Sequence, residues 1–393
     1  MIKTINMTSS DWVDSSSACA IVGVRRQTLY AYVSRKMVRT CTDPADARRS
    51  LYSRADLAAL ARRSSRPRSR ASVATEAIRW GDPVLATSIS GVRNGELFFG
   101  DVNARDCAAS MSLEDIIAHH CGVAPPLTQR SAGPVPQGDT PIERALHYLS
   151  TQTEVCEPML DRGRHDHAQA GMRLLSGFVN ALLGERRDGP AHARLTAAWN
   201  LNDRSAEAAR QALVLLSDHE LNPSTFAVRV CASTGASLPA SLIAGLATLS
   251  GPLHGGVCRR ASDAIRAAST SEAALEVFLA HAGETSPYGY GFGHPLYPDG
   301  DPRAACLLEY LDPSEPSLLA LERVAKRVGQ RPNIDAALAV LVEVHRWPED
   351  AAFLIFAMGR ITGWIAHAIE QAKNGSIIRP RARYLPCADP IVR

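Results

Sequence analysis

Residues 217–256 read SDHELNPSTFAVRVCASTGASLPASLIAGLATLSGPLHGG, and they connect a strongly apolar stretch to two polar loops that each contain a histidine. In SLIAGLATLSG (241–251), apolar residues recur at helical spacing and a glycine ends the stretch. His219 and His254 lie at breaks between helices, where backbone N–H groups lack helical partners. Glycines beside His254 let the backbone approach a ligand closely. The stretch therefore predicts helices with ligand-binding loops between them.

Helical spacing of apolar residues also dominates the rest of the chain after residue 100. Just before it, DPVLATSISGVRNGELFFG (82–100) alternates apolar and polar residues around Asn94-Gly95, which is a strong β-hairpin signal. We therefore expect residues 81–393 to form a mainly α domain with one short β hairpin at its start. Further stretches with helical spacing are 143–152, 167–184, 206–220, 267–283 and 351–375.

A small winged helix-turn-helix domain is expected in front, over residues 1–63. Two short helices joined by a glycine-containing turn form the skeleton of a helix-turn-helix. The expected parts are a helix over Ser15–Ile21 ended by Gly23, a helix over Arg25–Lys36, a hairpin over 40–53 and a helix over 54–63. This pattern over residues 12–63 resembles MerR-type regulators, which implies DNA as a partner.

Composition supports a boundary between these two domains. SSRPRSRAS (64–72) shows no apolar periodicity, and we place a linker at residues 64–80. The first 72 residues hold 14 Lys/Arg against 5 Asp/Glu, although the net charge of the whole chain is only +3. If the protein binds a polyanion, this basic end is where it would bind. The alternative is a protein-binding or lid element whose charges are merely solvated. The candidate DNA-binding residues are Arg25, Arg26, Arg35, Lys36, Arg48 and Arg49.

The bulk composition is that of a globular protein in a reducing compartment. With 46% hydrophobic and 21% charged residues, a chain of 393 residues can bury a large core. No stretch approaches the roughly 20 uninterrupted apolar residues of a membrane span, and the first residues lack the apolar core of a signal peptide. The nine cysteines never form CxxC, which argues against disulfides or zinc. We expect a cytoplasmic protein with no membrane partner and no metal.

Two further polar loops add chemistry to the histidine-bearing ones. YGFGHPLYPDGDPRA (290–304) contains His294, and GQRPNIDAALAVL (329–341) places Asp335 at the expected start of a helix. Each signal alone is weak, because a histidine beside glycine is more often structural than catalytic. An aspartate at a helix start is commonly a capping residue. Both interpretations of Asp335, cap and functional carboxylate, stay open on these local patterns.

Four motifs occur together in one order: DHELNPSTF (218–226), GPLHGG (251–256), GFGHPLYPDGDPRA (291–304) and RPNID (331–335). In order and separation they resemble the citrate synthase family, over about residues 82–380. The resemblance implies a large helical domain interrupted by a small one at about residues 260–350. It also implies a homodimer.

The implied activity is a condensation of an acyl-CoA, with acetyl-CoA as first choice, and oxaloacetate, with release of CoA. By resemblance, Asp335 is the base that deprotonates the carbon next to the thioester. His254 donates a hydrogen bond to the enolate, and His294 polarises the ketone. Acyl-CoA is a substrate, so no cofactor is implied. Propionyl-CoA, which would give 2-methylcitrate, is the alternative donor, since one methylene is worth only ~1–3 kcal/mol of discrimination.

The resemblance further implies cationic groups for the oxaloacetate dianion, and arginine pairs with carboxylates better than lysine does. Ser224 would bond the second nitrogen of His254, and Arg379 would reach the site of a partner subunit. Helices such as 241–251 would then lie in the dimer interface. The implied substrate-binding residues are His219, Asn222, Ser224, Arg303, Arg360 and Arg379.

A departure from the family pattern leaves a second function open. Bacterial members usually carry basic residues after the histidine, where this chain has Pro295-Leu296-Tyr297-Pro298, and LFFGDVNARDC (97–107) lacks the arginine of a YRGY-like run. Those cations would contact the CoA phosphates. The alternative function is a DNA-binding transcriptional regulator that senses oxaloacetate, citrate or an acyl-CoA. The intact Asp335 favours the enzyme, and the missing cations favour the sensor.

Overall fold

The chain divides into two compact units, Met1–Ala86 and Thr87–Arg393, each with its own hydrophobic core. The expected linker, residues 64–80, lies outside the described residues. The computed structural model describes residues 12–24, 26–34, 37–43, 46–58, 85–124, 134–154, 156, 158–159, 163–283 and 285–382, without the side chains of residues 47 and 48.

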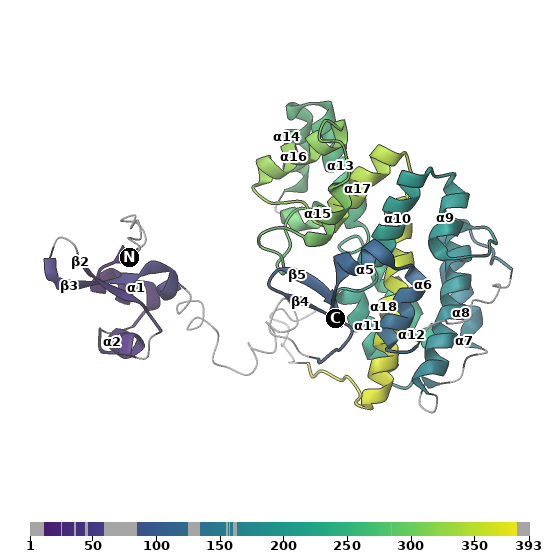
Figure 1. Ribbon diagram of the computed structural model, residues 1–393, viewed down its shortest axis with the longest axis horizontal. Helices are drawn as coiled ribbons and strands as arrows, with labels where there is room; N and C mark the ends of the chain where they lie inside the picture. The colour runs from purple at the N-terminus through teal and green to yellow at the C-terminus, as the bar shows by residue number, and fades with distance from the viewer. Residues whose placement is uncertain are drawn as a thin grey trace, which may run out of the picture. The chain divides into compact units, whose positions relative to one another are not determined.

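The first unit contains two short helices and a three-stranded sheet (Figure 1). Asp14 caps the first helix by accepting from Ser17 N at 2.7 Å, and Gly23 ends it with a φ of 68°, which glycine adopts without strain. The strands pair antiparallel in the order β1-β3-β2. The elements are β1 (Trp12–Val13), α1 (Ser15–Val22), α2 (Arg26–Ser34), β2 (Thr40–Asp43) and β3 (Asp46–Ser53).

Apolar side chains from every element of the first unit meet in one small core. Leu29 from α2, Tyr52 from β3 and Leu57 from a helical turn at residues 54–58 are all buried. The structure thus confirms three expected local features: the helix that begins at Ser15, its end at Gly23 and the hairpin within residues 40–53. The remainder of the helix expected over 54–63 lies outside the described residues.

The second unit begins with the expected hairpin. Strands β4 (Ser90–Arg93) and β5 (Glu96–Phe99) pair antiparallel, and β6 (Val102–Asn103) extends the sheet. Asn94 and Gly95 between them both have positive φ, 53° and 79°, as a two-residue hairpin loop requires. Apart from this sheet, the described part of the unit is built from helices.

The helices of the second unit surround one long apolar helix, α18 (Ala351–Asn374), which packs on α6, α8, α10, α11 and α12 (Figure 1). By length and composition α18 could cross a membrane, but 94% of its most apolar window is buried inside the protein, as in a core helix. The others of this group are α5 (Ala104–Ser110), α6 (Leu113–Cys121), α7 (Pro141–Thr153), α8 (Arg164–Leu183), α9 (Ala191–Trp199), α10 (Asp203–Leu215), α11 (Pro223–Ala232) and α12 (Leu238–Leu249).

A second group of helices gathers on one side of this unit, in green in Figure 1. The single helical stretch expected over residues 267–283 is divided, because the Ser271 hydroxyl accepts from Ala274 N and starts a new helix there. The limits of a small subdomain at about 260–350 stay a prediction. The elements are α13 (Val257–Thr270), α14 (Glu272–Ala282), the 3₁₀ turn η2 (Pro287–Tyr290), α15 (Pro302–Leu308), α16 (Pro316–Val328) and α17 (Ile334–His345).

Candidate active site

Helix ends from both groups present the three predicted catalytic residues. His254 lies in the turn between α12 and α13, and His294 lies in the loop between η2 and α15. Asp335 occupies the first turn of α17. Arg360 acts electrostatically on His254 and Asp335, and Arg303 acts on His294 and Asp335. Segments separated by up to 81 residues of sequence therefore contribute to this candidate site.

Aromatic rings hold His294 in place. Its imidazole lies 5.0 Å from the ring of His219 in an edge-on contact and 4.9 Å from the ring of Tyr297. Its Nδ1 accepts a hydrogen bond from Leu296 N at 3.2 Å. A backbone N–H can only donate, so the neutral ring carries its proton on Nε2. His294 is therefore a hydrogen-bond donor through Nε2.

His219 lies behind this ring rather than at an open surface. It is 7% exposed, and its Nε2 lies 2.8 Å from the hydroxyl of Tyr297. Burial, reinforced by the charges of Arg303 and His294, lowers the pKa of His219 well below its usual value. His219 is thus a neutral ring that helps fix Tyr297 and His294.

The imidazole of His254 is bound to the start of α11. Its Nε2 lies 2.9 Å from Ser224 Oγ, as predicted, and its ring meets Phe356 edge-on at 5.8 Å. Burial first, and then the charge of Arg360, lowers the pKa of His254 to about 4. His254 is therefore neutral at pH 7.

One hydroxyl proton on Ser224 serves two possible acceptors. Asn222 Oδ1 lies at 2.7 Å and His254 Nε2 at 2.9 Å, whereas Trp364 Nε1–H can only donate to Ser224, at 3.3 Å. Asn222 is also the N-cap of α11, because its Oδ1 accepts from Thr225 N. The side chain of Asn222, predicted to bind substrate, thus orients Ser224 and the helix start.

The interpretation of Asp335 as a helix cap is wrong. Asn333 is the N-cap of α17, and its side chain accepts from Asp335 N at 3.0 Å. The carboxylate of Asp335 instead accepts a hydrogen bond from the thiol of Cys258 at 2.9 Å. Burial raises the pKa of Asp335 to about 6, although Cys258 and Arg303 act in the opposite direction. Asp335 is therefore a stronger base than an exposed aspartate.

Arg303 and Arg360 supply two buried positive charges beside these groups. Arg303 is 3% exposed and forms a bidentate pair with Asp301, while Arg360 is 1% exposed and donates from Nε to Leu216 O at 2.8 Å. Burial lowers the pKa of Arg360 to about 10, so it still carries its charge at pH 7. Asp218, whose Oδ2 lies 3.1 Å from His367 Nε2, balances part of that charge. The arrangement suits an anionic ligand.

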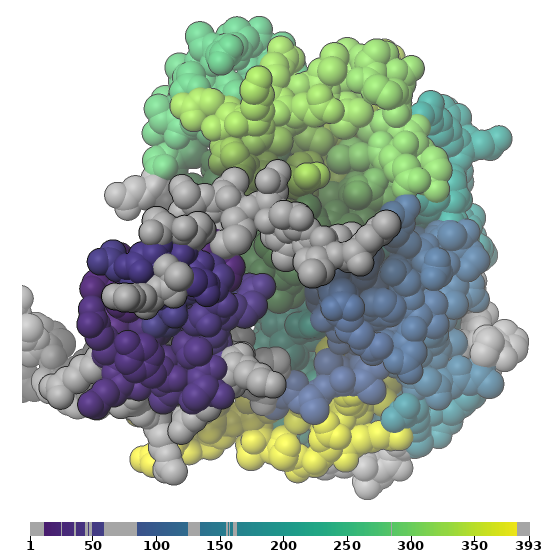
Figure 2. Space-filling model, turned by 60° about the vertical axis from the view of Figure 1, so that its left-hand side comes forward, coloured from purple at the N-terminus to yellow at the C-terminus, as the bar shows by residue number. Residues whose placement is uncertain are grey.

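Arg379 lies apart from this set in the single chain. It belongs to the exposed segment 375–382 on the surface of the second unit (Figure 2, yellow), which Ser233 holds by accepting from Ile378 N at 3.0 Å. Ser233 caps the end of α11 opposite to Ser224, about 13 Å along the helix axis. The chain alone does not bring Arg379 to His254 and Asp335.

Sequence reasoning missed four side chains of this site. Tyr297 and Tyr288 flank the ring of His294, Asp301 holds Arg303, and Cys258 bonds Asp335. Asp301 and Tyr297 both lie in the motif 291–304. Their closeness in sequence to Arg303 and His294 was the signal that could have identified them. Cys258 carried no such signal, because its partner lies 77 residues away.

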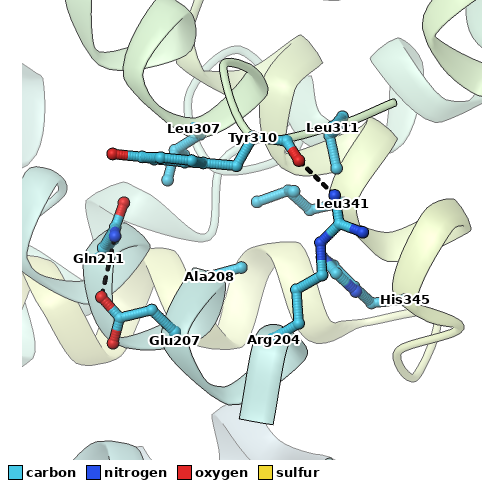
Figure 3. Close-up of a pocket in the computed structure, with 9 residues that line it drawn as sticks. All are labelled: Arg204, Glu207, Ala208, Gln211, Leu307, Tyr310, Leu311, Leu341 and His345. Carbon is cyan, nitrogen blue, oxygen red and sulfur yellow. Dashed lines mark hydrogen bonds between the residues drawn. The ribbon is translucent and has the colours of Figure 1, made fainter. Parts of the chain in front are cut away.

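A separate cavity of about 440 Å³ lies between α10, α15 and α17 (Figure 3). Leucines from α15 and α17 line one part of it, and Arg204 reaches across to the carbonyl of Tyr310. None of the predicted catalytic or substrate-binding residues lines it. Among the described residues, no group of three or more His, Cys, Asp or Glu is placed to hold a metal ion.

The candidate DNA-binding residues of the first unit are only partly described. Arg26 is exposed on α2 and donates to Ser16 Oγ at 3.4 Å, and Arg49 on β3 pairs with Asp46 at 3.3 Å. Arg48 belongs to β3, but its side chain lies outside the described residues, as do Arg25, Arg35 and Lys36 entirely.

Comparison with known proteins gives a consistent result. The family model "Citrate synthase, C-terminal domain" matches residues 153–381. Citrate synthase 2 of Bacillus subtilis is 35% identical over 188 residues, which are 45% of this chain and 50% of that protein. The 2-methylcitrate synthase of Shewanella oneidensis is 33% identical over 195 residues, which are 44% and 48% of the two chains. The chain thus spans about half the length of these curated relatives.

A solved structure supports the fold. The citrate synthase of Thermoplasma acidophilum, in a ternary complex with carboxymethyl coenzyme A and oxaloacetate, matches with a TM-score of 0.63 at 22% identity. The match covers 79% of this chain and 95% of that one. Since the family model covers more than half of the sequence, the chain belongs to the citrate synthase family.

Proposed function

We propose that this protein condenses an acyl-CoA, with acetyl-CoA as the preferred donor, with oxaloacetate and releases CoA. The observation that carries the proposal is the contrast between one unusually basic carboxylate and two neutral imidazoles. The pKa of Asp335 is raised to about 6, whereas the pKa values of His254 and His294 are lowered to about 4. Such a set can remove a proton from carbon and donate hydrogen bonds to oxygen at the same pH.

In the first step, Asp335 takes a proton from the carbon next to the thioester. The electron pair moves to the thioester oxygen, and the enolate so formed accepts a hydrogen bond from His254. For His254 to donate from Nδ1, its Nε2 must accept the hydroxyl proton of Ser224. The 2.9 Å contact between these two atoms meets that requirement when the Ser224 hydroxyl proton points to His254 and not to Asn222 Oδ1.

In the second step, the enolate carbon attacks the ketone carbon of oxaloacetate. His294 donates from Nε2 to the ketone oxygen as it becomes an alkoxide, and Nε2 is the nitrogen that carries the proton when Nδ1 accepts from Leu296 N. Arg303 and Arg360 would bind the two carboxylates. Water then hydrolyses the thioester and releases CoA as a thiol.

We also propose that the active form is a cytoplasmic homodimer in which Arg379 completes the site of the partner subunit. Its position on the surface, at the far end of α11 from Ser224, supports this role. The small residues of α12 were expected at a subunit interface. At Gly245, however, the small residue allows close packing within the chain, because a side chain there would meet Val228 and Trp364. The interface would therefore use the other faces of the surface helices.

The direct test is thiol release by the purified full-length protein. We expect release that depends on oxaloacetate, with acetyl-CoA used more efficiently than propionyl-CoA. A higher kcat/KM for propionyl-CoA would change the assignment to 2-methylcitrate synthesis, and no release above background with either donor would rule out the enzyme.

A second candidate function is a DNA-binding regulator that senses oxaloacetate, citrate or an acyl-CoA. It is supported by the local elements of the first unit, because two short helices with Gly23 between them and a following hairpin are elements that a winged helix-turn-helix also contains. A mobility-shift assay on the DNA upstream of the coding region, with and without residues 1–72, tests it. Salt-sensitive binding lost on truncation would support the regulator, and binding that is absent or independent of salt would count against it.

A further inference from the structure

Cys258 is the direct neighbour of the proposed base. Its thiol donates to Asp335 Oδ1 at 2.9 Å, and the two side chains are 2% and 9% exposed. Within the described residues, Cys258 is the one side chain that makes a hydrogen bond to the Asp335 carboxylate. Asn333 instead accepts from the backbone N–H of Asp335. We propose that Cys258 is a positioning residue that holds the Asp335 carboxylate in the orientation needed for deprotonation at carbon.

The geometry gives the two carboxylate oxygens different tasks. Rotation about the last side-chain bond of an aspartate is soft, so an unbonded carboxylate samples a broad range of angles. The bond from Cys258 fixes Oδ1 and so fixes the direction of Oδ2. Oδ2 is then the oxygen presented to the acyl carbon, in a single orientation. A base held in one orientation loses less freedom on reaching the transition state.

A thiol is suited to this task because it is a weak donor. A stronger donor would stabilise the carboxylate more and would make it a weaker base. The contribution of Cys258 to the pKa of Asp335 has this downward direction, but burial outweighs it. The thiol itself stays protonated, because burial and the charge of Asp335 raise the pKa of Cys258 well above its usual value. Cys258 therefore acts as a donor and not as a nucleophile.

The position of Cys258 also links the base to the enolate donor. His254 lies in the turn that leads into α13, and Cys258 lies in the first turn of that helix, four residues later. Helix α13 packs along α17, which carries Asp335. The short segment 254–258 thus sets the distance between the base Asp335 and the enolate donor His254. At one end of this segment His254 bonds Ser224, and at the other end Cys258 bonds Asp335.

The kinetic test compares Cys258→Ala and Cys258→Ser with the wild-type protein, and it rests on the proposed condensation. We expect Cys258→Ala to lower kcat at least about fivefold, with KM for oxaloacetate within about twofold, because orientation of the base and not substrate binding is lost. The acid limb of the kcat/KM profile should move to higher pH. Cys258→Ser should regain most of kcat, with its acid limb at or below that of the wild type.

Cys121→Ser is the matched control, since Cys121 on α6 is a buried thiol outside the site and its substitution should change neither kcat nor the pH profile. Infrared difference spectra of the wild-type protein between pH 5 and pH 8 test the contact without any turnover, and Asp335→Asn is the control for assignment. We expect the S–H stretching band to shift as Asp335 ionises, and the shift to vanish in Asp335→Asn.

The two measurements separate the two ideas. If the S–H band shifts with pH but the protein releases no CoA, the contact between Cys258 and Asp335 is supported and the proposed condensation is ruled out. An active enzyme whose Cys258→Ala variant keeps the wild-type kcat and pH profile would overturn the positioning role. The same conclusion would follow if the S–H band did not respond to the ionisation of Asp335.

Discussion

Asp301 and Arg303 form a bidentate ion pair inside the candidate site, with Arg303 Nη2 2.7 Å and Nε 3.0 Å from the two carboxylate oxygens of Asp301. The side chains of Arg303 and Asp301 are only 3% and 0% exposed, and Asp301 also accepts from Ile334 N at the start of α17. Asp301 therefore connects the proposed substrate-binding arginine to the helix that carries Asp335. The pair fixes the guanidinium before any substrate arrives.

Asp301→Asn should weaken both the fold and substrate binding. The substitution leaves a buried guanidinium without its counter-charge, and breaking a buried pair in this way costs about 3–5 kcal/mol. We expect the free energy of unfolding to fall by about 3 kcal/mol and KM for oxaloacetate to rise at least about tenfold. Urea unfolding and steady-state kinetics measure the two effects.

An exposed ion pair provides the control for this variant. Glu343 on α17 accepts from Arg266 Nε at 2.8 Å, and its side chain is 31% exposed. Glu343→Gln should change the unfolding free energy by less than about 1 kcal/mol and leave KM unchanged. Equal losses in the two variants would contradict the importance of burial for the Asp301 pair.

Asp335→Asn should stabilise the protein at alkaline pH. The pKa of Asp335 is about 6 in the folded chain against a usual 3.8, so the folded state holds this proton more tightly than the unfolded state. This contribution to stability is fully present below pH 3.8 and is lost as the pH rises through about 6. The neutral variant escapes the loss, which amounts to about 3 kcal/mol.

Urea unfolding at several pH values between 4 and 8 checks this expectation. The stability of Asp335→Asn relative to wild type should grow with pH over that range and level off above about pH 7. A difference that does not depend on pH would mean that Asp335 has an ordinary pKa and is no better a base than a surface aspartate.

Asp335→Ala should separate chemistry from binding. Loss of the base removes proton abstraction, so turnover should fall by about 10²- to 10⁴-fold. Oxaloacetate binds through Arg303 and Arg360 in our proposal, so its stabilising effect in a thermal melt should persist. If the variant loses turnover and oxaloacetate-dependent stabilisation together, Asp335 is structural rather than catalytic.

Ser224→Ala should impair the enolate donor. Without the hydroxyl, His254 Nε2 loses its partner at 2.9 Å, which in our proposal directs the ring proton to Nδ1. We expect kcat to fall about 100-fold, as for other losses of one positioned donor, with little change in KM for oxaloacetate. Thr234→Ala, just beyond the other end of α11, is the control and should retain the wild-type kcat, because the Thr234 hydroxyl donates to Cys231 O at that helix end. Comparable losses of kcat in both variants would show a general effect on the helix.

Local patterns predicted the helices well because their ends carry strong signals. The glycine at Gly23 and the Asn94-Gly95 turn both require a positive φ, and both lie where the sequence indicated. The division at Ser271 was missed because the apolar spacing continues across it, while the capping hydroxyl that starts the new helix was overlooked.

The site was predicted less completely, because its contacts join distant segments. The motifs placed His254, His294 and Asp335 at helix ends, and Ser224 lies against His254 as expected. The role of Tyr297 was missed, because residues 295–298 were interpreted only through the basic residues that they lack. The Tyr297 hydroxyl is buried and bonds His219. No local rule distinguishes a cap from a base at Asp335, and the distinction depends on Asn333 and on a thiol 77 residues away.

Mixing two inactive variants should restore activity if Arg379 works in the site of the partner subunit. In a mixed dimer of Arg379→Ala and Asp335→Ala chains, one site combines the intact Asp335 of the first chain with the intact Arg379 of the second. The other site lacks both residues. Random exchange makes half of the dimers mixed, so about a quarter of the wild-type activity should return.

The measurement is thiol release after the two purified variants are mixed under conditions that allow subunit exchange. Sedimentation of each variant shows whether a dimer forms at all. The matched control replaces Arg379→Ala with Arg303→Ala, because Arg303 lies in the same chain's site and is bonded to Asp301 there. A mixed dimer of Arg303→Ala and Asp335→Ala has one defect in each site and should stay inactive. Recovery in this control, or none with Arg379→Ala, would show that Arg379 does not complete the partner's site.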